Sequence, residues 1–186
     1  MSDPNIKRVR LFHFNDFHRR LDPLSDGTGG AARLVGKIKQ LEQDNPDAIT
    51  VNLGDVCGDN TAQGPNHFSP IPELFNQADV DILALGNHEF EDPTNDYQSL
   101  KEGLIKPFRG EVLVANVKHA DGRSIEGTKP YTIRQLRDTE EIGSLDRLEI
   151  GMLQSQHYLC VVEPPGRGPY GSRLWQLLLG GGKARE

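Results

Sequence analysis

The 186-residue chain has few of the residues that mark several large protein classes. Two cysteines are too few for a disulfide framework or a cysteine-only zinc site. No apolar run approaches the ~20 residues of a membrane-spanning helix, so we expect no membrane segment. Positive charge is scarce too, and the formal net charge of −6 argues against a nucleic-acid binder. The first eight residues include no apolar stretch typical of a secretory signal, so the chain as it stands is expected to be cytoplasmic.

Short apolar strands alternate with helices along most of the chain. Alternating or continuous apolar residues predict strands at 9–14, 48–53, 80–85, 112–115, 131–133 and 148–152. Helical spacing of apolar residues predicts helices at 31–41, 71–78 and about 92–105. Strands that alternate with helices at these lengths indicate an α/β domain with a mainly parallel sheet.

The composition changes near residue 152. The later residues are rich in glycine and proline and have no useful hydrophobic periodicity. We therefore expect a domain over residues 8–152 and an atypical, poorly ordered tail over residues 153–186.

Side chains that can bind metals follow three successive predicted strands. They are Asp16 and His18 after the first, Asp55 after the second, and Asn87 and His88 after the third. Because the carboxyl ends of parallel strands meet at one edge of a sheet, we expect these side chains to converge. Carboxylate, imidazole and carboxamide donors suit Mn, Fe, Zn or Mg ions, and one carboxylate can bridge two cations. The alternative is that each motif only forms a turn.

Five short motifs resemble those of the calcineurin-like metallophosphoesterases, in particular their 5′-nucleotidase branch. They are Phe14–His18, Gly30–Arg33, Leu53–Asp55, Leu85–Phe90 and Ala115–Val117. The resemblance covers about residues 8–152. It implies a sandwich of mixed, mainly parallel sheets flanked by helices, present here in incomplete form, with a centre for two divalent metal ions.

The resemblance also implies the metal ligands. Asp16 and His18 would bind one ion, Asp55 would bridge both, and Asn87 would bind the second. The family's downstream histidine motifs are missing from this sequence, so we expect the second metal site to be incomplete and the chain to be a truncated form.

Two further residues receive catalytic roles from the resemblance. His88 would stabilise the transition state or donate a proton to the leaving group. Glu91 would orient His88 from the position where similar proteins have an aspartate, one methylene shorter.

The implied function is metal-dependent hydrolysis, in which a metal-bound hydroxide attacks a phosphate monoester of a nucleotide. One alternative is a non-catalytic fragment or metal-binding module. Another is the same fold acting on cyclic nucleotides, UDP-sugars or a sulfur ester. An incomplete sandwich would leave sheet edges uncovered, so self-association through these edges is also expected.

Overall fold

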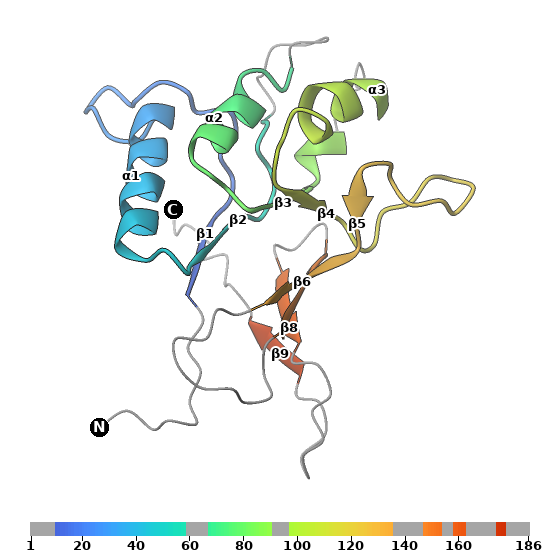
Figure 1. Cartoon of the computed structure of the whole chain (residues 1–186). Helices are drawn as coiled ribbons and strands as arrows, with labels where there is room; N and C mark the ends of the chain where they lie inside the picture. Colours follow the sequence, from blue (N-terminus) through green and yellow to red (C-terminus); the bar gives the residue numbers. More distant parts are fainter. Residues whose placement is uncertain are drawn as a thin grey trace, which may run out of the picture.

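The structure is a computed structural model that describes residues 10–58, 67–90, 97–135, 147–153, 158–162 and 174–177. These residues form two sheets and a set of helices. Figure 1 shows the helices on one side of the first sheet and the second sheet on its other side. Glu91, which was predicted to orient His88, lies outside the described residues.

The first sheet is entirely parallel. Its strands follow the order of the chain: β1 (Leu11–Phe14), β2 (Ile49–Asn52), β3 (Ile82–Ala84), β4 (Glu111–Leu113) and β5 (Thr128–Lys129). The predicted α/β domain with a parallel sheet is therefore confirmed. The sequence did not predict β5, because two polar residues carry no strand periodicity.

Helices connect the first four strands. They are α1 (Ala31–Asp44), α2 (Ile71–Gln77), a single 3₁₀ turn at His88–Phe90, and α3 (Tyr97–Leu100), which continues as a π-helix over Lys101–Ile105. Pro72 and Glu73 stand in the first turn of α2, where a missing N–H and a negative charge are both favourable. None of the described helices is long and apolar enough to cross a membrane.

The second sheet is antiparallel. Its strands are β6 (Tyr131–Gln135), β7 (Arg147–Leu153), β8 (Tyr158–Val162) and β9 (Leu174–Leu177), in that order. An ion pair of 3.4 Å joins Arg134 of β6 to Glu111 of β4 in the first sheet. β8 and β9 fall within residues 153–186, where the sequence predicted no regular structure; the domain boundary itself stays a prediction.

Buried apolar side chains line both faces of the parallel sheet. Val51 and Ile82 belong to a small cluster on one face, and their neighbour Leu83 belongs to the larger cluster on the face toward the helices. In the larger cluster the Phe75 ring of α2 packs 5.3 Å from the Phe14 ring and 5.8 Å from the Phe17 ring. The helix-side core therefore extends beyond the end of β1 into the loop that follows it.

Candidate metal centre

The loops that follow β1 and β2 run side by side. Backbone N–H groups of Asp16, His18 and Arg19 donate to carbonyl oxygens of residues 54–56, at N···O distances of 3.2, 3.0 and 2.8 Å. The sheet pairing of β1 with β2 is thus continued by hydrogen bonds between loops. This pairing brings the first predicted motif next to Asp55.

Several residues of these loops have left-handed backbones. Asp16 has a φ of 52°, His18 of 46° and Asp55 of 53°, and Gly54 before it has a φ of 102°. This conformation costs a non-glycine residue about 1–2 kcal/mol, and it persists where surrounding contacts hold it in place. Such residues concentrate at functional sites, and three of the predicted metal ligands have this backbone, as does Arg19 in the same loop.

Three of the predicted side chains meet at the ends of β1, β2 and β3. His18, Asp55 and His88 each place a potential ligand atom within 4.8 Å of the other two. The two imidazole rings are 4.7 Å apart at 68°, and Asp55 is buried. Two ring nitrogens and a carboxylate oxygen form a donor set that suits Zn, Mn or Fe, so these residues fit the predicted metal.

The turn that follows β3 also contacts Asp55 through its backbone. The N–H of His88 donates to Oδ1 of Asp55 at 3.2 Å, which fixes one carboxylate oxygen. The sequence predicted His88 as a residue next to the phosphate. Its position within the cluster makes a ligand role equally available to it.

The remaining predicted ligands adjoin this cluster. Asp16 is exposed; its Oδ1 lies 3.5 Å from Nε2 of His18, and its Oδ2 accepts a short hydrogen bond from Asn15. Asn87 is half-buried and lies between Gly86 and His88 in the same turn. Their roles as ligands stay predictions.

Glu89 is the residue of this region whose role sequence reasoning missed. It is 1% exposed, and its carboxylate accepts four backbone N–H groups: Gly86 at 2.6 Å, Val56 at 2.8 Å, Asp55 at 3.1 Å and Cys57 at 3.3 Å. Burial raises the pKa of Glu89 to about 7; the charge of Asp55 also raises it, and the backbone hydrogen bonds oppose the rise. Its only sequence signal was its place in the Leu85–Phe90 motif.

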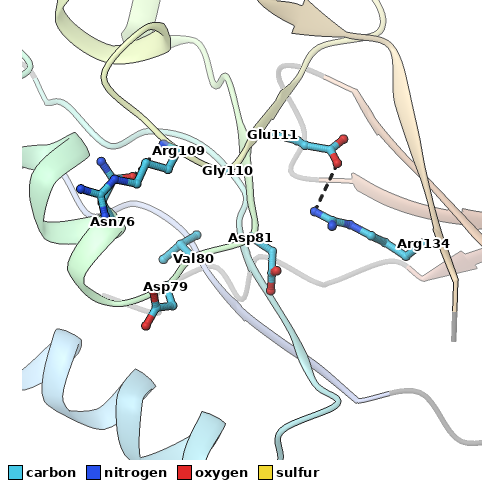
Figure 2. A pocket seen from close by; sticks show the side chains of 8 residues that line it. All are labelled: Asn76, Asp79, Val80, Asp81, Arg109, Gly110, Glu111 and Arg134. Carbon is cyan, nitrogen blue, oxygen red and sulfur yellow. Dashed lines mark hydrogen bonds and ion pairs between the residues drawn. The ribbon is translucent and has the colours of Figure 1, made fainter. Parts of the chain in front are cut away.

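A pocket of about 370 Å³ lies at the opposite end of the strands (Figure 2). Asp81 immediately precedes β3, and Glu111 is the first residue of β4, so the pocket is separate from the strand-end cluster. Acidic and basic side chains share its lining, which is made by Asn76, Asp79, Val80, Asp81, Arg109, Gly110, Glu111 and Arg134. In Figure 2 Arg134 extends toward Glu111.

The sequence is similar to those of known phosphoesterases. A sequence profile of the calcineurin-like phosphoesterase family matches residues 9–161. Human 5′-nucleotidase is 31% identical over 125 residues, a match that covers 59% of this chain and 20% of that protein. The chain therefore spans about a fifth of the length of this relative.

Solved structures share the fold. The 5′-nucleotidase precursor of Thermus thermophilus superposes with a TM-score of 0.61 at 22% identity, over 90% of this chain and 32% of its own. The NAD nucleotidase of Haemophilus influenzae has a TM-score of 0.59 at 22% identity, over 78% of this chain and 26% of its own. The fold predicted from the motifs is confirmed.

Proposed function

Because the chain belongs to the calcineurin-like phosphoesterase family, we propose that its strand-end site serves the metal-dependent hydrolysis of a nucleotide phosphate monoester. The observation that carries this proposal is the convergence of His18, Asp55 and His88 within 4.8 Å. The nucleotide is suggested by relatives that are named 5′-nucleotidases.

Each side chain of the site has a definite task in this proposal. Asp55 and His18 would hold a divalent cation, and Asp16 and Asn87 would add oxygen donors beside them. A cation held there supplies Lewis-acid activation of the ester and of water. The His88 ring, in contact with the His18 ring, would donate a hydrogen bond or a proton to the phosphate. A buried carboxylate close to two imidazoles suits these roles, because it offers a negative charge to the cation and leaves one ring for the ester.

The experiment is phosphate release from AMP and from p-nitrophenyl phosphate, measured with and without MnCl₂. We expect turnover that depends on Mn²⁺ and that Asp55→Asn abolishes, because this substitution removes a buried negative charge from the centre. Asp47→Asn, the same change at an exposed position before β2, is the matched control and should leave turnover unaltered.

Other outcomes separate the alternatives. Mn²⁺ binding without release of phosphate from either ester would favour a metal-binding module over an enzyme. Release from p-nitrophenyl phosphate but not from AMP would keep the reaction class and reject the nucleotide. Turnover that Asp55→Asn leaves intact would overturn the site.

A further inference from the structure

We propose that Glu89 is a positioning residue that sets the metal affinity of the site by locking two ligand-bearing turns together; this inference rests on the function proposed above. Glu89 belongs to the turn after β3, and the amides that it accepts come from both that turn and the turn after β2. Its carboxylate does not belong to the cluster of His18, Asp55 and His88, so it acts through the backbone of the ligands.

The two oxygens of Glu89 divide the four hydrogen bonds between them. Oε2 accepts the N–H of Gly86 and the N–H of Asp55, so a single atom connects the two turns. Oε1 accepts the N–H groups of Val56 and Cys57, which directly follow Asp55. Glu89 therefore holds the backbone around Asp55 through the amides of three consecutive residues.

A hydrogen bond from His88 makes the position of the Asp55 side chain depend on the same two turns that Glu89 holds together. His88 donates its backbone N–H to Oδ1 of Asp55, and His88 immediately precedes Glu89. Any shift of the turn after β3 relative to the turn after β2 would therefore move the Asp55 carboxylate relative to the His88 ring. Outer contacts of this kind orient metal ligands, and their loss typically costs 10–100-fold in metal affinity.

Chemistry explains why a carboxylate is needed at this position. Each of the four N–H groups is a donor, so both terminal atoms of the side chain at position 89 must be acceptors. An ionised carboxylate supplies two acceptor oxygens, whereas a glutamine of the same shape supplies one oxygen and turns an NH₂ group toward the other pair of donors. Glu89→Gln therefore breaks one pair of bonds without opening a cavity.

The test is Mn²⁺ binding measured by calorimetry, with MnCl₂ alone as the probe, at a temperature where every variant is folded. We expect Glu89→Gln to raise the Kd by about 10–100-fold and to change the Mn²⁺ electron paramagnetic resonance spectrum. A merely structural role would lower the unfolding temperature and leave the Kd of the folded molecules unchanged. Glu102→Gln is the matched control, because Glu102 of the π-helix is exposed and pairs with Lys106, which follows that helix.

Hydrogen exchange of the wild-type protein is a second measurement that needs no variant. If the hydrogen bonds of Glu89 favour Mn²⁺ binding, Mn²⁺ binding must favour those hydrogen bonds to the same extent. Mn²⁺ should therefore slow amide exchange in peptides that contain residues 54–57 and 86–89, but not in a peptide from α1. Unchanged exchange in those peptides on Mn²⁺ binding would overturn the inference, as would an unchanged Kd in Glu89→Gln.

The two proposals fail in different ways. A wild-type protein that binds Mn²⁺ but releases no phosphate overturns the proposed hydrolysis, and the Glu89→Gln comparison of Kd still decides the positioning role. Active wild type together with a Glu89→Gln variant of normal Kd overturns the positioning role alone. Absence of Mn²⁺ binding by the wild type overturns both.

Discussion

Gly54 and Gly86 lie with their backbones in contact: a Cβ added to Gly54 would stand 2.6 Å from the amide nitrogen of Gly86. Each glycine immediately precedes a predicted metal ligand, Asp55 in one turn and Asn87 in the other. A Cβ on Gly86 would likewise fall 2.6 Å from the amide nitrogen of Asp55. The two turns can therefore approach closely only because neither position has a side chain.

Substitution of Gly54 by alanine should both destabilise the fold and weaken metal binding. The left-handed backbone costs alanine about 1–2 kcal/mol, and the contact with Gly86 adds to that cost. Urea unfolding of Gly54→Ala should show the loss. Gly122→Ala is the matched control, because Gly122 also has a positive φ, of 85°, but has nothing within 4 Å of the added carbon. Equal losses in the two variants would mean that the contact with Gly86 contributes nothing.

Divalent metal should stabilise the folded chain. A ligand that binds only the folded state at 100 times its Kd adds about 2.7 kcal/mol to the free energy of unfolding. We expect MnCl₂ to raise the Tm of the wild type and to lose this effect in His18→Ala. His13→Ala, at an exposed position of β1, should keep the full shift. A shift that survives in His18→Ala would place the bound ion elsewhere.

The stability of the protein should depend on pH through Glu42 of α1. Burial raises the pKa of Glu42, while its hydrogen bond from Thr50 Oγ1 opposes the rise and the charges of Asp79 and Asp81 add to it. With a folded-state pKa above that of the unfolded state, its contribution is full below the ordinary value of 4.5 and is lost as pH rises through the folded-state pKa.

The corresponding variant is Glu42→Gln, which stays neutral and can still accept from Thr50. Its free energy of unfolding, relative to the wild type, should rise with pH above about 4.5 and then level off. Denaturant titrations between pH 4 and 8 would measure this trend. A difference for Glu42→Gln that stays flat over this range would refute the assignment.

Truncation of Phe75 should affect both the core and the metal site. Phe75 is 1% exposed and packs against the rings of Phe14 and Phe17. Phe75→Ala should cost about 3–5 kcal/mol of stability. Because Phe17 stands between Asp16 and His18, Mn²⁺ affinity should fall as well. Phe90→Ala, at a position that is 38% exposed, should cost much less stability; similar losses for both would contradict the packing described here.

Much of the strand-end geometry could be predicted from the sequence. The periodicity of three strands places His18, Asp55 and His88 just after their carboxyl ends, and parallel pairing of β1, β2 and β3 brings such residues together. The hydrogen bonds between Glu89 and the backbone could not be predicted from the sequence. Glu89 binds amides that lie more than 30 residues earlier in the chain, and no pattern of side chains encodes such a contact.

The order of strands in the parallel sheet determines which part of the chain supplies the site. Because β1 to β5 are arranged as they occur in the chain, each strand pairs with the strand that precedes it in the sequence. Synthesis therefore presents these strands in the same order in which they lie side by side in the sheet. His18, Asp55 and His88 all belong to the first 88 residues, so the N-terminal half of the chain contains every residue of the candidate metal centre.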